Sequence, residues 1–146
     1  MNVNRMVYGA TSKDRETLVT HTATGEFDVQ LTPIGAADAA VGSMAISKTF
    51  RGDLVATGTG QMLAVGTAVK GSVGYVAMER VSGTLEGRQG SFALQHTGTM
   101  DKGSPTLSVT VVPDSATDDL AGLTGSMAIK IEGGKHFYTF EYSLPG

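Results

Sequence analysis

The sequence predicts an all-β fold, namely a single antiparallel eight-stranded closed barrel. Apolar side chains alternate with polar ones through most of the chain, as they do in strands that bury one face. Turn residues such as Glu86-Gly87 and Gly133-Gly134 separate these runs at spacings that suit hairpins. An antiparallel meander of eight strands removes its exposed edges by closing on itself. A two-sheet β-sandwich is the competing architecture.

The barrel domain is expected to span residues 23–146, after an aperiodic N-terminal arm at residues 1–22. The first strand carries Phe27, Val29 and Leu31 on one face and is expected to end at Pro33, which cannot donate a ladder hydrogen bond. The other strands are expected at 43–50, 54–64, 75–84, 88–100, 107–112, 125–131 and 136–144.

Two segments between strands are candidates for helical turns. Residues 36–41 are expected to form a loop or a short helical turn. Ser115 and Asp118 have the Ser-x-x-Asp spacing of a helix start, and Leu120 and Leu123 follow them. We expect one or two helical turns there, capping one end of the barrel.

Composition narrows the class of protein and its partners. A chain of 146 residues with 40% hydrophobic and 17% charged residues is typical of one globular domain with a real core. A net charge of −3 without a basic patch argues against a nucleic-acid partner. The chain lacks an apolar run long enough to span a membrane and lacks a secretory signal pattern at its start. The absence of cysteine excludes disulfides and fits a reducing compartment, so we expect a cytoplasmic protein.

The stretch from Gly74 to Thr99 holds the candidate catalytic residues, Glu79 and His96. Both stand in alternating rows of apolar residues on neighbouring strands, so they share an apolar interior if those rows face inward. Burial alone would raise the pKa of Glu79 and suit it to proton transfer. The structural alternative is a buried carboxylate paired with Arg80, Arg88 or His96, because a lone buried charge is costly.

Further side chains are candidates for ligand binding through aromatic rings, hydroxyls or charge. They are Tyr75, Phe92, His136, Tyr138, Tyr142 and Arg88. Lys48 interrupts the apolar row of its strand and is expected to point into a wet end of the barrel. Three dispersed histidines without cysteine argue against a metal site, and no nucleotide-binding motif is present, so no cofactor is expected.

Several motifs resemble those of a family of uncharacterised bacterial proteins, a domain of unknown function with an allene oxide cyclase-like β-barrel. They are Gly52-Asp53-Leu54, Tyr75–Arg80, Gly83–Arg88, Leu94-Gln95-His96 and the closing His136-x-Tyr138 with Tyr142. The resemblance covers about residues 23–144 and implies the barrel fold. Allene oxide cyclases are isomerases that act on an apolar epoxide inside the barrel. The chain departs from the family pattern at Asp114, where the pattern has glycine and glycine would permit a positive φ.

Three functions remain open at this point. The barrel interior binds a small, largely apolar molecule; or the protein is an isomerase or cyclase in which Glu79 or His96 moves a proton; or it is a non-catalytic structural oligomer. In the last case Met44, Phe92 and Phe140 would fill the barrel. A homo-oligomer is expected under all three, because strands such as Leu107–Val112 carry apolar residues on both faces.

Overall fold

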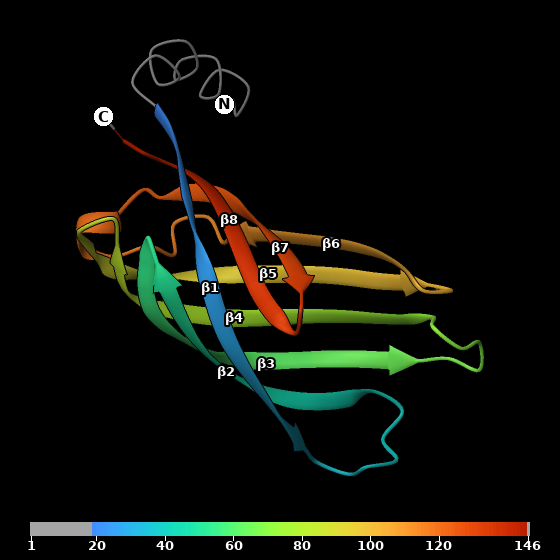
Figure 1. Ribbon diagram of the computed structural model, residues 1–146. Coiled ribbons are helices and arrows are strands. Elements are labelled where there is room, and N and C mark those ends of the chain that lie inside the picture. The colour runs from blue at the N-terminus through green and yellow to red at the C-terminus, as the bar shows by residue number, and fades with distance from the viewer. Residues whose placement is uncertain (1–18, 146) are drawn as a thin grey trace, which may run out of the picture.

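The computed structural model describes residues 19–145, and its eight antiparallel strands form a closed barrel in chain order (Figure 1). The predicted barrel is therefore confirmed. The strands are β1 (Val19–Ile34), β2 (Gly42–Gly52), β3 (Leu54–Gly66), β4 (Val73–Leu85), β5 (Arg88–Asp101), β6 (Ser104–Val111), β7 (Thr124–Glu132) and β8 (Lys135–Leu144). One short 3-10 helix, η1 (Asp118–Leu120), precedes β7. No helix among residues 19–145 has the length and apolarity needed to cross a bilayer.

Strand β1 is longer at both ends than expected. Residues 1–18 of the predicted arm lie outside the described residues, but residues 19–22 belong to the barrel wall, where they pair with β8. At the other end, β1 continues through Pro33 to Ile34, so the predicted break at Pro33 is wrong. The pairing with β8 stops at Phe27, and beyond it β1 pairs with β2. Such one-sided pairing is where a strand tolerates proline.

The hairpin turns adopt the backbone conformation that their sequences predict. Glu86 and Gly87 have φ values of 45° and 87°, and Lys102 and Gly103 have 50° and 90°. Positive φ at two successive residues matches the right-handed twist of the flanking strands. Asp114, at the position where the family pattern has glycine, also has a positive φ of 61°. Aspartate is among the few residues that enter this region readily, so the substitution keeps the loop conformation.

The predicted helical segment forms a single turn, η1, rather than a capped helix. Its N-cap is Thr117 and makes no side-chain capping bond, so the interpretation of Ser115-x-x-Asp118 as a helix start is wrong. The Ser115 hydroxyl instead accepts a hydrogen bond from the Ala93 backbone N–H at 3.0 Å. This bond fixes the loop to β5, and Leu120 is buried against the barrel. The expectation that this segment caps one end of the barrel is confirmed.

Aromatic side chains fill the end of the barrel that η1 covers, which we call the closed end. Phe92 stacks on Phe140 with ring centroids 5.8 Å apart, and Phe140 stacks on Tyr142 at 5.4 Å. The Tyr138 hydroxyl accepts a hydrogen bond from the Leu54 N–H at 2.9 Å and donates one to the Arg51 carbonyl at 2.8 Å. The closed end is thus packed as a core. Met44, by contrast, is only partly buried and belongs to the other half of the barrel.

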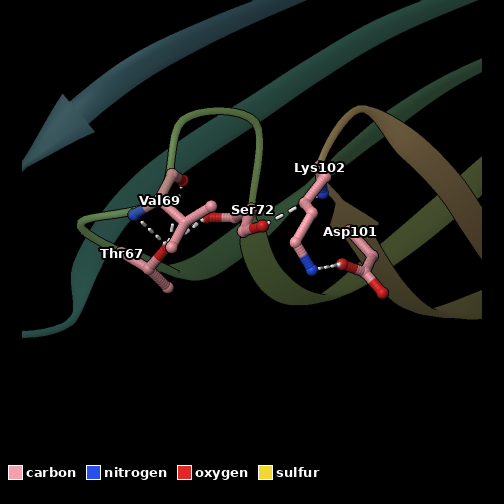
Figure 2. A network of polar contacts seen from close by, with 5 residues as sticks. All are labelled: Thr67, Val69, Ser72, Asp101 and Lys102. Atoms are coloured by element: carbon pink, nitrogen blue, oxygen red, sulfur yellow. Dashed lines mark hydrogen bonds and ion pairs between the residues drawn. The ribbon is translucent and has the colours of Figure 1, made fainter.

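The opposite end, which we call the open end, is held by contacts between two loops (Figure 2). Thr67 Oγ1 donates to the Ser72 carbonyl at 2.9 Å, which folds the β3–β4 loop on itself. The Lys102 N–H donates to Ser72 Oγ at 3.0 Å, and the Gly103 N–H donates to the Gly71 carbonyl at 3.0 Å. These bonds tie the β3–β4 loop to the β5–β6 turn and fix that side of the open end.

The barrel wall has one weak seam, between β6 and β7. These strands pair only through Thr110 and Ser126, whereas β7 and β8 pair from Thr124 to Glu132. In Figure 1 the two strands diverge on the way to the open end. Between β6 and β7 the barrel wall therefore lacks a continuous ladder of backbone hydrogen bonds.

Candidate functional site

A buried charged cluster lies inside the barrel, formed by Lys48 on β2, Glu79 on β4 and His96 on β5. Lys48 Nζ donates a hydrogen bond to Glu79 Oε1 at 2.9 Å, and His96 Nε2 lies 2.7 Å from the same oxygen. All three residues are buried. The expectation that Glu79 and His96 face one interior is confirmed, and so is their pairing. Lys48 also points inward, but it is buried and paired rather than in a wet end, so that expectation is wrong.

The residues around the cluster explain how the fold accommodates it. Gly58 lies opposite Lys48 in the β2–β3 register, and a Cβ on Gly58 would collide with Glu79 Oε2. The absent side chain makes room for the carboxylate. Lys48 Nζ also lies 4.7 Å from the ring centroid of Phe27 and 5.8 Å from that of Phe50. Electrostatic attraction to these rings offsets part of the cost of burying the ammonium group.

The partners of Glu79 determine its charge. Burial acts to raise the pKa of the carboxyl, but the hydrogen bond from His96 and the charge and hydrogen bond of Lys48 together lower the pKa below its ordinary value. The expected upward shift is therefore wrong, because the contacts of Glu79 with His96 and Lys48 together outweigh the effect of burial. Glu79 is ionised at neutral pH and cannot act there as a proton donor. Its second oxygen, Oε2, is buried without a hydrogen-bond partner in the described part of the chain.

A cleft of about 570 Å³ opens beside the seam, toward the open end. We call it the mouth cleft. Most of its lining is apolar, and the lining comes from β4, β5, β6 and β7: Tyr75, Thr99, Met100, Pro105, Thr106, Leu107, Met127, Ala128, Ile129 and Ile131. Tyr75 is held across Gly98, where a Cβ would collide with its ring, and burial raises the pKa of its hydroxyl.

The other candidate binding residues lie away from the mouth cleft. Phe92 and Tyr138 are core residues of the closed end. Tyr142 donates a hydrogen bond to Glu86 Oε1 at 2.6 Å, and burial together with this acceptor raises the pKa of Tyr142 to about 12. Arg88 is exposed at the β4–β5 turn. The structure therefore does not bring these residues together with Tyr75.

His136 is half-buried on β8, with its ring centroid 5.1 Å from that of Phe27. It lines a separate, more polar depression of about 290 Å³ with Asp28 and Arg51. Arg51 donates to Asp28 at 2.7 Å, and this exposed pair lowers the pKa of the aspartate. Among residues 19–145, no three histidine, cysteine or carboxylate side chains converge as metal ligands.

Sequence reasoning missed Lys48 as a partner and missed most of the mouth cleft. The signal for Lys48 was present, since it is the one charged residue in the inward row of β2. Met127, Ile129 and Leu107 gave no comparable signal, because an alternating apolar row predicts an ordinary core face.

Fold and site together define a closed antiparallel β-barrel with a packed closed end, an interior ion pair and an apolar cleft at a weak seam. The model of the family described as "Protein of unknown function (DUF3224)" matches residues 23–142. The chain therefore belongs to this family, which confirms the family resemblance of the motifs.

A solved relative has the same fold. The chain is similar to the crystal structure of a protein with unknown function from the DUF3224 family of Shewanella oneidensis MR-1, with 50% sequence identity and a TM-score of 0.82. The match covers 88% of this chain and 99% of the other. The comparison with curated proteins found no match.

Proposed function

We propose that the protein binds a small, largely apolar molecule in the mouth cleft. The observation that carries this proposal is the seam: β6 and β7 share one bridge, and an apolar cleft of about 570 Å³ opens beside it. Small-molecule sites typically have volumes of roughly 300–1,000 Å³ and mostly apolar walls. A contribution from Met100 and Met127 suits ligands of varied shape, because methionine is flexible and polarisable.

The position of the charged cluster is an argument that the ligand carries one polar group. On β4, Glu79 lies two inward-facing positions beyond Tyr75, and on β5, His96 is the next inward-facing residue after Gly98. The polar cluster therefore follows the apolar cleft along the same two strands. Glu79 Oε2 is a buried acceptor without a hydrogen-bond partner in the described residues, so a ligand group that reaches it is a hydrogen-bond donor, such as an alcohol.

Titration with Nile red, a neutral apolar dye, tests the site. We expect Ile131→Glu to weaken dye binding at least about tenfold, because it places a charge on the cleft wall. Ile131 is 66% exposed, so the substitution leaves the core intact. The matched control is Val55→Glu on the outer face of β3, where the valine is 61% exposed. Circular dichroism verifies that both variants are folded.

Dye binding that is equally strong in wild type and Ile131→Glu would place the dye elsewhere and refute the mouth cleft as the site. A loss of binding in Val55→Glu as large as that in Ile131→Glu would also contradict the proposal, because the effect would then follow charge rather than position.

Isomerase or cyclase activity is the second candidate function, and the buried cluster is what favours it. A carboxylate and an imidazole 2.7 Å apart form a common arrangement for moving a proton. Because Glu79 is held in its ionised form, the roles divide: Glu79 orients the His96 imidazole, and His96 exchanges the proton with the substrate.

Turnover of unsaturated epoxides by wild type and Glu79→Gln tests this second candidate. We expect the variant to lose at least about a hundredfold in rate if the cluster moves a proton, as is typical for general acid–base catalysis. Equal rates in the two proteins, or no turnover by wild type, exclude the activity on these substrates. Urea denaturation of Glu79→Gln separates a chemical defect from unfolding.

A further inference from the structure

Large apolar side chains are exposed on the outside of the barrel, over β3 and β4. Leu63, Val76 and Met78 are 44%, 48% and 51% exposed. Two apolar depressions of about 510 and 440 Å³ lie here, and they share Leu63, Val76 and Thr97. Together they form one continuous apolar surface, which adjoins the mouth cleft at Tyr75 and Thr99.

Charge is nearly absent from the surface around these residues. Arg80 is the one charged residue among the outward-facing positions of β2–β6 in this region. The region comprises residues 43–49, 57–65, 76–84, 91–99 and 106–110. The other side of the described barrel is different, because β1, β7 and β8 carry outward charges at Glu26, Asp28, Lys130 and Glu141. We call the surface over β2–β6 the uncharged face. Depletion of charge is a property of the central part of protein interfaces.

We propose that the uncharged face binds a second copy of this chain, to form a two-fold symmetric dimer. Strand β3 pairs with both of its neighbours along nearly its whole length, so a partner cannot add a strand there and must pack on the side chains. A surface of valine, leucine, threonine and serine is complementary to itself, whereas a strongly charged partner finds only Arg80 as a counter-charge on it. Two sheets packed face to face bury such surfaces at a spacing of about 10 Å.

The area of the face suits a dimer. The five strand segments of the face are about eight residues long on average, and at about 3.3 Å per residue and about 4.8 Å between strands they cover on the order of 600 Å². Specific complexes bury roughly 800 Å² on each partner. Arg80 does not prevent this packing, because its long side chain can extend to the rim with the charge in water.

Strands β3 and β4 are the ones whose outer faces carry exposed apolar residues. The sequence had led us to expect apolar residues on both faces of Leu107–Val112 instead, and that expectation is wrong. Leu107, Val109 and Val111 of β6 point inward, while Thr106, Ser108 and Thr110 point outward. Strand β6 is therefore apolar on one face only. Apolar residues on both faces occur instead at Leu63 with Met62 and at Val76 with Tyr75.

Sedimentation velocity over about a hundredfold range of concentration tests the proposal. We expect a dimer in wild type and an at least tenfold weaker one in Met78→Glu, because each interface would gain two buried carboxylates. Ile131→Glu is the control, since it adds the same charge at an exposed site away from the uncharged face, and its dimer should match that of wild type.

Spin labels on engineered cysteines give an independent readout, because the chain has no cysteine of its own. A label at Val76→Cys should show a short intermolecular distance, and a label at Thr139→Cys on β8 should not. Monomeric wild type at all concentrations would overturn the proposal. So would a dimer that Met78→Glu leaves unchanged, or one in which the Thr139 labels are the closer pair.

Discussion

Replacing Lys48 by methionine should lower the free energy of unfolding by about 3–5 kcal/mol at neutral pH, because it leaves the buried charge of Glu79 with His96 as its only partner. Methionine keeps much of the volume of lysine, so the loss reports mainly on charge. Urea denaturation measures it. The control is Lys70→Met at an exposed position of the β3–β4 loop, where we expect a change within about 0.5 kcal/mol.

The pH dependence of this loss identifies its cause. Because the folded pKa of Glu79 lies below its ordinary value, the ionised carboxylate stabilises the wild type above that ordinary value. This contribution is lost as the pH falls through the folded pKa. The deficit of Lys48→Met should therefore shrink in acid, where a protonated Glu79 no longer needs a cation. A deficit that stays constant as the pH falls from neutral through the folded pKa of Glu79 would show that packing causes the loss, and would contradict the role given to the ion pair.

Truncating Phe92 to alanine should cost about 3–5 kcal/mol of unfolding free energy, because Phe92 is fully buried and stacked on Phe140. We expect Nile red affinity to stay within about twofold of wild type, since the cavity left behind lies in the closed end and not in the mouth cleft. Thermal and urea denaturation measure the first effect, and dye titration of the folded variant measures the second.

Phe137→Ala is the matched control, because Phe137 points outward on β8 and is only partly buried. Its cost should be less than half that of Phe92→Ala. If Phe92→Ala were as stable as wild type but lost dye binding, Phe92 would be a ligand-contacting residue, as the sequence suggested, and the division into a packed end and a binding end would be wrong.

Local pattern predicted most of the fold. Period-two alternation located seven of the eight strands to within about three residues at each end, and the Glu86-Gly87 and Gly133-Gly134 turns connected them correctly. The first strand was the exception. Its threonine-rich start resembles a polar arm, and only the pairing of Val19–Phe27 with β8 makes it a strand. That partner lies more than 100 residues away, so no local signal reports it.

The site was predictable in part, for a similar reason. Glu79 and His96 stood out as polar groups in apolar rows, and the structure brings them together. Lys48 gave the same signal, but its ion pair with Glu79 joins strands that are not neighbours. The direction of the Glu79 pKa shift depends on His96 and Lys48 together, so it could not be predicted from burial alone. The mouth cleft depends on ladder bonds that are missing between β6 and β7, and a sequence pattern does not record missing pairing.

The most direct test of the proposed function is a methyl NMR titration of the protein with 1-dodecanol, which has an apolar chain and one hydroxyl donor. Binding in the mouth cleft predicts saturable shifts at the methyl groups of Leu107, Met127 and Ile131. Methyl groups of Leu63, Val76 and Met78 on the uncharged face should not shift. Shifts confined to that face, or none at concentrations that saturate Nile red binding, would contradict the proposal.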